Sequence, residues 1–371
     1  MILITGGAGF IGSNFIFHLL ENDTSNEKII VIDKLTYAAN IGNFDELKND
    51  ERFTLIKSDI IDPMIVKRTF DEFNPRAVIN FAAESHVDRS INSPNEFIKT
   101  NINGTFNLLK CSLAYFGRLP DEASSQNQDD FSITPSKRSF KFIHISTDEV
   151  YGSLNYKEPP FTESSPYKPN SPYAASKAAS DHLVRAWFRT YNLPTIISNC
   201  SNNYGPYQFP EKLIPLTILN ATMGKDIPVY GDGKQVRDWL YVQDHCNAII
   251  SILNKGIVGE TYNIGGNAEI TNFELVSRIC GILDELIPVE SREIKKNHDH
   301  LIKFVKDRPG HDIRYAINNQ KIYSELDWRP TENLETGLEK TVKWYLQNKK
   351  WTDSIKTKHY KDWIETNYGR R

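Results

Sequence analysis

The chain has 371 residues, of which 39% are hydrophobic and 25% charged, and its formal net charge is −3. This length exceeds what one hydrophobic core usually supports, so we expect a large domain and a smaller one. The composition excludes a disordered or fibrous protein, and the interspersed charges offer no basic surface for nucleic acid or an anionic membrane. A small-molecule partner is therefore favoured.

The cysteines lie far apart, without a C-x-x-C pair, which favours reduced thiols over a disulfide framework. They are Cys111, Cys200, Cys246 and Cys280. No segment offers the roughly 18 uninterrupted apolar residues of a membrane span, and no basic segment precedes the apolar start of the chain, as it would in a secretion signal. We expect a cytoplasmic protein.

Short β-rich runs alternate with amphipathic stretches over the first 200 residues. This pattern predicts an α/β fold of the Rossmann type, a doubly wound parallel sheet with helices on both faces. The expected strands are Ile2–Thr5, Ile29–Asp33, Thr54–Lys57, Ala77–Phe81, Phe142–Ser146 and Thr195–Ser198. The expected helices include Ser13–Glu21, Pro63–Phe73 and Asn101–Tyr115.

Residues 1–200 are expected to form this cofactor-binding domain. After them the alternation weakens, and residues 201–371 are expected to form mainly a smaller mixed α/β domain that binds the substrate, with segments that can return to the first domain. The polar segment 120–140 is interpreted as an exposed loop.

A glycine-rich turn, residues 6–12 (GGAGFIG), joins the first strand to the first helix. Gly6 permits the turn, Gly9 lets the backbone approach a pyrophosphate, and Gly12 allows close packing of helix on strand. Asp33 ends the next strand, where a carboxylate can accept hydrogen bonds from an adenosine ribose and would repel the 2′-phosphate of NADP. The sequence therefore predicts NAD as cofactor, although Lys34 complicates that choice.

Two further strand ends are expected beside the cofactor. Asp59 and Ile60 follow the third strand and could face the adenine. Ala82 and Ala83 follow the fourth strand, with small side chains where a cofactor passes closely, although tight packing explains them equally well.

A Y-x-x-x-K motif opens a predicted helix at Ser171 and Pro172. Tyr173 and Lys177 then share one helix face. The Lys177 ammonium, assisted by a positive nicotinamide ring, can lower the pKa of Tyr173 toward neutrality, so that its phenolate removes a hydroxyl proton during hydride transfer. The motif alone indicates only a surface pair, but an NAD fingerprint before it favours catalysis.

Thr147, Asp148 and Glu149 follow the fifth strand, at the strand end where such sheets bind ligands. Oxidation of a sugar at C4 makes its C5 proton acidic and its C6 hydroxyl a leaving group. The elimination then needs one carboxylate that takes a proton and another that donates one, and adjacent carboxylates in a partly desolvated site have separated pKa values. Capping of the next segment is the simpler alternative for this pair.

With these motifs the chain resembles the extended short-chain dehydrogenase/reductases (NAD-dependent epimerase/dehydratases), and within them the family of dTDP-glucose 4,6-dehydratases. The likeness runs over nearly the whole chain and also rests on residues 82–90 (AAESHVDRS), 199–207 (NCSNNYGPY), 210–215 (PEKLIP), 237–242 (RDWLYV) and 307–312 (DRPGHD).

The resemblance implies a lyase that dehydrates dTDP-glucose to dTDP-4-dehydro-6-deoxy-glucose. Tyr173 would remove the C4 hydroxyl proton as hydride passes to NAD, with Thr147 hydrogen-bonded to the C4 oxygen. Glu149 would take the C5 proton, Asp148 would protonate the departing C6 hydroxyl, and the hydride would return to C6. Because each turnover regenerates the cofactor, we expect NAD to stay bound.

The resemblance also implies the ligand contacts. Those to NAD are expected at Gly6, Gly9, Phe10, Ile11, Gly12, Asp33, Lys34, Leu35, Thr36, Asp59, Ile60, Ala82, Ala83, Ser85, Thr100, Tyr173, Lys177 and Asn203. Those to the nucleotide sugar are expected at Ser85, Thr147, Asn202, Glu211, Lys212, Leu213, Pro228, Tyr230, Arg237, Asn272, Arg308 and His311. Guanidinium groups suit a diphosphate because they form bidentate, charge-assisted bonds, although a single arginine more often marks a surface ion pair.

The stretch Asn101–Tyr115 is expected to be a core or subunit-interface helix, and the resemblance implies a homodimer formed by such helices. His298 and His300 have the spacing of a metal motif, but no further ligands cluster near them in sequence. A solvated loop is favoured there, and no metal is expected.

Three alternatives stay open. A nucleotide-sugar 4-epimerase of the same fold needs the Tyr–Lys pair and a Ser or Thr, and a decarboxylase also oxidises C4, but neither requires an acid at position 148. A non-catalytic NAD-binding sensor or scaffold would not need the full set of catalytic residues. The nucleotide base, and whether the product serves rhamnose or another deoxysugar, are not determined by the sequence.

Overall fold

The computed structural model describes residues 1–22, 26–122, 135–292 and 295–355. Most of the segment interpreted as an exposed loop, 120–140, therefore lies outside the described residues, as does the end of the predicted second domain. Within the described ranges, no helix is long and apolar enough to cross a membrane.

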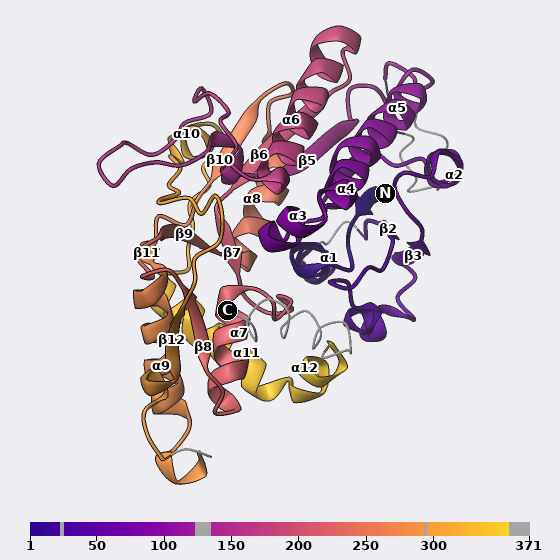
Figure 1. The fold of residues 1–371 in the computed structure, drawn as a ribbon. Helices are drawn as coiled ribbons and strands as arrows, with labels where there is room; N and C mark the ends of the chain where they lie inside the picture. Colours follow the sequence, from indigo (N-terminus) through magenta and orange to yellow (C-terminus); the bar gives the residue numbers. More distant parts are fainter. Residues whose placement is uncertain (23–25, 123–134, 293–294, 356–371) are drawn as a thin grey trace.

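A parallel, seven-stranded sheet forms the centre of the larger part of the molecule (Figure 1), in the strand order β10-β6-β5-β4-β1-β2-β3. The strands are β1 (Ile2–Thr5), β2 (Ile29–Asp33), β3 (Phe53–Lys57), β4 (Ala77–Asn80), β5 (Lys141–Thr147), β6 (Thr195–Cys200) and β10 (Thr261–Ile264). β1, β2 and β4 are buried along their whole length, as expected for strands covered on both faces. The predicted Rossmann-type fold is confirmed.

Helices cover both faces of this sheet, each through an apolar stripe. On one face Phe15, Ile249 and Ile322 join the core, and on the other Phe70 and Leu108 do so. The helices of the first face are α1 (Phe10–Asn22), α8 (Val242–Lys255) and α10 (Gln320–Leu326); those of the second are α2 (Pro63–Phe73), α5 (Thr105–Phe116) and α6 (Pro172–Tyr191).

The expected helix Asn101–Tyr115 begins differently from the prediction. A π-helical segment, Ile98–Gly104, precedes α5. Within this segment the Asn101 side chain accepts a hydrogen bond from the Glu84 backbone N–H (2.8 Å) and donates one to its carbonyl (3.0 Å). The wide turn occurs beside the cavity described below, where π segments are common, and hydrophobic periodicity could not reveal it.

The chain after β6 builds a second core and returns to the first. The second core includes Ile214, Trp239, Leu275 and Leu338. Its strands are β7 (Asn202–Tyr204), β8 (Ile227–Tyr230), β9 (Val236–Tyr241), β11 (Glu269–Thr271) and β12 (Ile302–Val305), and its helices are α7 (Leu213–Thr222), α9 (Asn272–Leu286) and α11 (Leu334–Gln347), followed by α12 (Lys349–Ile355). α8 and β10 lie among these elements in the sequence, but they pack with the parallel sheet of the first core. The domain boundary at residue 200 stays a prediction.

Two short helices, α3 (Val87–Asn92) and α4 (Pro94–Phe97), follow β4. They carry the chain from the carboxyl end of β4 toward α5, and α3 contacts α6. Asp88 and Arg89 on α3 also form ion pairs with Arg308 and Glu211, so the AAESHVDRS segment lies where the two cores meet.

Candidate active site

A cavity of about 410 Å³ lies at the carboxyl ends of the parallel strands, between the two cores. In the sheet order, β1 has β4 on one side and β2 on the other, so the crossover direction reverses there, and such switch points are where doubly wound sheets bind ligands. Every residue predicted for the site lines this cavity except Leu35. The Leu35 backbone N–H donates to Asp33 Oδ1 instead (2.7 Å).

The glycine turn has the close backbone packing that its sequence predicts. Gly6 has a φ of +70°, and a Cβ at this position would lie 2.6 Å from the Ala82 backbone. A Cβ on Gly12 would lie 2.5 Å from the Gly6 carbonyl oxygen. At Gly9 the nearest atom would be 3.4 Å away, so this glycine leaves room at the start of α1, a natural site for a phosphate.

Asp33, at the end of β2, forms a hydrogen bond with this turn. Its Oδ2 accepts from the Ala8 N–H (2.9 Å), and burial raises the pKa of its carboxyl against the two backbone hydrogen bonds that lower it. Lys34 forms an ion pair with Asp59 (2.9 Å). The Lys34 charge is therefore paired with a carboxylate of the cavity wall.

Tyr173 and Lys177 lie on the first turns of α6, where the Ser171 hydroxyl accepts from the Ala174 N–H (3.0 Å). Both side chains are buried, at 8% and 2% exposure. Burial and the charge of Glu149 raise the pKa of Tyr173, against a hydrogen bond from Thr147 that lowers it. The pKa of Tyr173 is thus raised in this structure, opposite to the lowering toward neutrality that the sequence predicted; the effect of Lys177 together with a nicotinamide ring stays a prediction.

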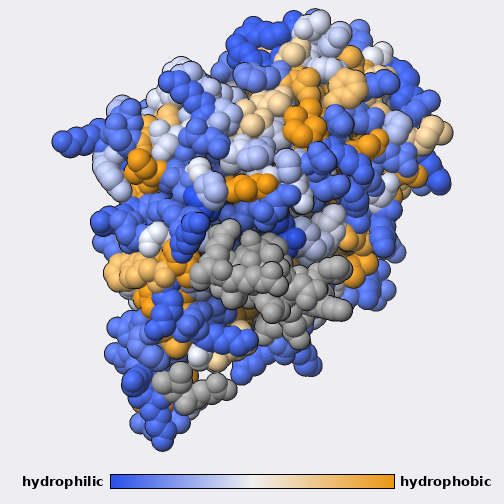
Figure 2. Space-filling model, viewed as in Figure 1, coloured by the Kyte–Doolittle hydropathy of each residue, from blue (hydrophilic) through white to orange (hydrophobic). Residues whose placement is uncertain are grey.

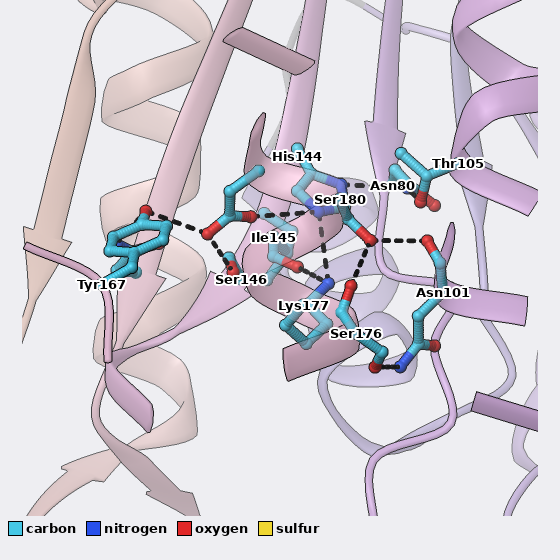
Figure 3. Close-up of polar contacts among 12 residues, drawn as sticks. Asn80, Asn101, Thr105, His144, Ile145, Ser146, Tyr167, Ser176, Lys177 and Ser180 are labelled. Atoms are coloured by element: carbon cyan, nitrogen blue, oxygen red, sulfur yellow. Dashed lines mark hydrogen bonds and ion pairs between the residues drawn. The ribbon is translucent and has the colours of Figure 1, made fainter. Parts of the chain in front are cut away.

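The Lys177 ammonium points toward β5 (Figure 3), where it donates to the Ile145 carbonyl (2.7 Å). Burial lowers the pKa of Lys177 to about 8, and the nearby Asp181 carboxylate opposes this shift. Lys177 thus sits between the cavity and a buried polar layer beneath it.

Asp148 and Glu149 begin a short 3₁₀ helix, Asp148–Tyr151, after β5, and Thr147 caps it by accepting from the Glu149 N–H (3.3 Å). Asp148 is only 1% exposed, and its Oδ2 has no hydrogen-bond partner among the described residues. Burial and the Glu149 charge raise the pKa of Asp148 well above its usual value. Burial also raises the pKa of Glu149, but Arg308, Lys212 and Arg237 oppose that shift. The pKa of Asp148 is thus raised without a cation that dominates, whereas the rise in the pKa of Glu149 is opposed by three cations. Such a difference suits Asp148 as an acid and Glu149 as a base.

Arginine and lysine side chains from distant segments form one wall of the cavity. Arg308 pairs with Asp88 (3.2 Å), and Tyr230 donates to the same carboxylate (2.8 Å). Arg237 donates to the Asp312 carbonyl (3.0 Å) with its guanidinium over the Tyr315 ring. Arg308, Arg237 and Lys212 lower the pKa of Glu149 through their charges, and they form a positive wall of the cavity that suits a diphosphate.

Glu211 and Lys212 join this wall from the start of α7. Lys212 donates to the Ser85 carbonyl (2.9 Å). Glu211 is paired with Arg89 (2.9 Å) and accepts from the Tyr37 hydroxyl (3.0 Å). The predicted substrate contact at Glu211 is thus already engaged within the protein.

Sequence reasoning missed several residues of this site. His86 and Asp88 line the cavity, although the motif that contains them was noted only as part of the resemblance. Their signal was available: polar residues that follow a buried strand fall at the ligand-binding edge of a parallel sheet. His144 beneath Lys177 gave no signal, because a histidine inside an apolar strand usually belongs to the core.

The His298–His300 segment differs from the solvated loop that was expected. His298 is 5% exposed and lies 2.6 Å from Asp284. No group of three or more metal-ligating side chains occurs among the residues that the structure describes.

Comparisons with known proteins agree with this geometry. The family model described as GDP-mannose 4,6 dehydratase matches residues 3–341. A dTDP-glucose 4,6-dehydratase of Neisseria meningitidis is 52% identical, over 97% of both chains. A solved dTDP-glucose 4,6-dehydratase of Streptomyces venezuelae, with NAD and TYD bound, is 42% identical, with a TM-score of 0.81 over 95% of this chain and 99% of that one. A UDP-glucose 4-epimerase of Thermotoga maritima is 28% identical, with a TM-score of 0.76 over 93% and 98%. The chain belongs to the dTDP-glucose 4,6-dehydratase family.

Proposed function

We propose that this protein dehydrates dTDP-glucose to dTDP-4-dehydro-6-deoxy-glucose with NAD as its cofactor. The observation that carries the proposal is the adjacent pair Asp148, which is buried, and Glu149, which is half-buried; both line the same cavity as Tyr173. Burial favours a protonated Asp148, whereas three cations favour an ionised Glu149. A 4-epimerase or a decarboxylase does not require such an acid.

The residues of the cofactor side fit NAD. The open face of Gly9 at the start of α1 would receive the pyrophosphate, and Asp33 would accept from the ribose. When bound, NAD would accept the hydride from C4, and its reduced form would return that hydride to C6. The further cofactor contacts that we propose are at Gly6, Phe10, Ile11, Gly12, Lys34, Leu35, Thr36, Asp59, Ile60, Ala82, Ala83, Ser85, Thr100, Tyr173, Lys177 and Asn203.

In the oxidation step, Tyr173 takes the proton of the C4 hydroxyl, and the Thr147 hydroxyl holds the C4 oxygen. Lys177 stabilises the phenolate form that this step requires. Because Tyr173 and Glu149 face one cavity, the Glu149 charge opposes ionisation of the phenol, and the Lys177 cation is needed against it.

In the elimination step, Glu149 takes the proton from C5 and Asp148 gives its proton to the C6 hydroxyl, which leaves as water. The separation of the two pKa values provides the base and the acid from adjacent residues. At the end of the step Asp148 is ionised and Glu149 protonated.

The nucleotide diphosphate is held by the positive wall. Arg237, Arg308 and Lys212 would bind the phosphates, and Tyr230 would stack on the base. Arg308 would then share its charge between Asp88 and the substrate. The further substrate contacts that we propose are at Ser85, Asn202, Glu211, Leu213, Pro228, Asn272 and His311.

The experiment is a turnover panel of dTDP-, UDP-, CDP- and GDP-glucose without added NAD. We expect dTDP-glucose to give the alkali-sensitive chromophore of a 4-keto sugar at the highest kcat/KM. Formation of dTDP-galactose instead would contradict dehydration, and a preference for another nucleotide would correct the carrier. If neither the wild type nor Tyr173→Phe turns over any of these sugars, a non-catalytic role is favoured.

We also propose a homodimer formed through α5 and α6. Figure 2 shows hydrophobic side chains gathered on the face over these helices. Ile98, Phe106 and Tyr191 are 45%, 45% and 49% exposed, and the rings of Phe106 and Trp187 lie 5.7 Å apart. Phe106→Glu should yield a monomer in light scattering, whereas the control Phe304→Glu, at another exposed phenylalanine, should leave the dimer intact.

A cytoplasmic location is proposed as well. All four cysteines are free thiols, and Cys200, Cys246 and Cys280 are buried, as suits a reducing compartment.

A further inference from the structure

A polar layer lies beneath the cavity floor, between the sheet and α6 (Figure 3). Its central members are His144 on β5, which is 0% exposed, and Asp181 on α6, which is 2% exposed. Neither belongs to the cavity lining. Asp181 follows Lys177 by one helical turn, so both side chains face β5.

The imidazole of His144 lies between the two charged side chains of α6. Its Nε2 is 3.3 Å from Lys177 Nζ and 3.4 Å from Asp181 Oδ1. Its Nδ1 is 3.1 Å from Asn80 Nδ2, whose amide oxygen accepts from the Thr5 hydroxyl (2.6 Å). With Nδ1 as acceptor, the proton of the neutral ring lies on Nε2, on the side of the two charged groups. An ammonium has no lone pair to accept it, and Asp181 Oδ1, 3.4 Å away, has no hydrogen-bond partner among the described residues.

Asp181 is held firmly in this layer. Its Oδ2 accepts from the Ser146 hydroxyl (2.8 Å) and from the Tyr167 hydroxyl (3.0 Å). Asn199 supports Tyr167 by donating to its hydroxyl (3.1 Å). Two donors on one oxygen favour the ionised carboxylate, and a buried ionised carboxylate requires a nearby cation.

The ionisable groups that face this layer leave one candidate for that cation. Around Asp181 and Lys177 they are His144 from β5, Tyr151 from the 3₁₀ helix, Tyr167 from the segment before α6 and Cys200 from β6. On the cavity side of Lys177 they are Asp148, Glu149 and Tyr173. Burial lowers the pKa of His144 and raises that of Cys200 to about 12, so both are neutral near pH 7. Lys177 alone is positive among these groups.

We propose that Asp181, acting with His144, is a positioning group that keeps Lys177 protonated in its buried site and thereby sets the pH at which Tyr173 becomes a base. This role rests on the proposed function of Tyr173 and Lys177. The carboxylate and the ammonium balance each other across the imidazole, so that neither is an isolated buried charge. Burial raises the pKa of Asp181 to about 7 and lowers that of Lys177 to about 8, so each charge depends on the other near neutrality.

The test is Asp181→Asn, which keeps the size of the side chain and removes its charge. Without the anion, Lys177 loses its proton at lower pH and no longer stabilises the phenolate, so Tyr173 ionises only at higher pH. We expect the acid limb of kcat/KM for dTDP-glucose to move up by about one pH unit, with about tenfold lower activity below the limb and near-normal activity above it.

A second readout needs no substrate. Near-ultraviolet difference absorbance against Tyr173→Phe, in each background with excess NAD, follows the phenolate directly. Its midpoint should rise in Asp181→Asn by the same amount as the acid limb. This titration separates failure of the positioning role from failure of the proposed reaction, which wild-type turnover tests.

Two further variants complete the design. Tyr167→Phe removes one donor to Asp181, weakens its ionised form, and should shift both readouts in the same direction by a smaller amount, even if Asp181→Asn does not fold. Asp244→Asn is the matched control, because Asp244 is 2% exposed but caps residues 331 and 332 away from the cavity. Unchanged midpoints in Asp181→Asn and Tyr167→Phe, or an equal shift in Asp244→Asn, would overturn the proposal.

Discussion

The glycine turn at one end of the cavity is a backbone segment contiguous in sequence, whereas the positive wall consists of charged side chains that lie far apart in the chain. Gly6, Gly9 and Gly12 lie within one turn and allow close approach by lacking a side chain. Arg237 and Arg308 reach the cavity from separate segments and are already bonded to protein partners. The glycine turn is thus fixed by local backbone geometry, and the positive wall by contacts between distant segments.

The largest effect on turnover is expected from a variant that impairs the sugar chemistry and leaves the cofactor site intact. Asp148→Asn removes the acid that protonates the C6 hydroxyl, so overall turnover should fall by about 10²- to 10⁴-fold while C4 oxidation continues. Rapid mixing with dTDP-glucose should show reduced nicotinamide accumulating by absorbance, with bound NAD equal to wild type. Normal turnover, or no reduction at all, would contradict the role given to Asp148.

The next variant impairs the binding of NAD at the glycine turn. Gly6→Ala places a Cβ against the Ala82 backbone at a positive φ, which should cost about 1–3 kcal/mol and reduce the NAD that copurifies. Gly281→Ala is the control, because nothing lies within 4 Å of its Cβ in the helix α9. That control should stabilise the fold by about 0.5–1 kcal/mol in denaturant unfolding and leave NAD bound. Equal behaviour of the two variants would show that the turn is not constrained.

A smaller effect separates charge from geometry on the sugar side. Arg308→Lys keeps the positive charge but loses the planar fork that can bond Asp88 and a phosphate together. We expect KM for dTDP-glucose to rise by about tenfold, with kcat changed less than twofold. Arg278→Lys, at an exposed arginine paired with Glu335, should change neither parameter. A fall in kcat without a rise in KM would move Arg308 from binding to chemistry.

The smallest effect concerns the pH dependence of stability. The pKa of Asp148 is raised in the folded state, so the native protein binds a proton that the unfolded chain has released, and stability falls as pH rises above the ordinary carboxyl pKa. Asp148→Asn removes the group that binds this proton. Its free energy of unfolding in denaturant should decline less than that of the wild type between about pH 5 and about pH 8. An identical slope would show that Asp148 is ionised in the fold.

The same contrast explains what the sequence could predict. β1, β2 and α2 have their predicted boundaries within a residue, because buried strands and a capped helix leave local signals such as Asp62 before Pro63. The glycine turn and the Tyr173–Lys177 face are likewise local. Their placement around one cavity follows from strand ends that share one edge of the sheet.

What the sequence could not predict depends on contacts between distant segments. The partners of Arg308 and Glu211 lie more than a hundred residues away in the chain. The π-helical start at Ile98 and the buried site of His144 also leave no periodic pattern. Residue type could mark these side chains as polar, but only the fold shows what each one faces.

The most direct test of the central claim follows the hydride between the two sides of the cavity. Single-turnover conversion of dTDP-glucose carrying deuterium at C4 should give a 4-keto-6-deoxy product with that deuterium in the C6 methyl group, as read by NMR. This result is expected because the hydride removed from C4 is returned to C6 of the same sugar. Deuterium restored to C4, or lost to solvent, would contradict the account.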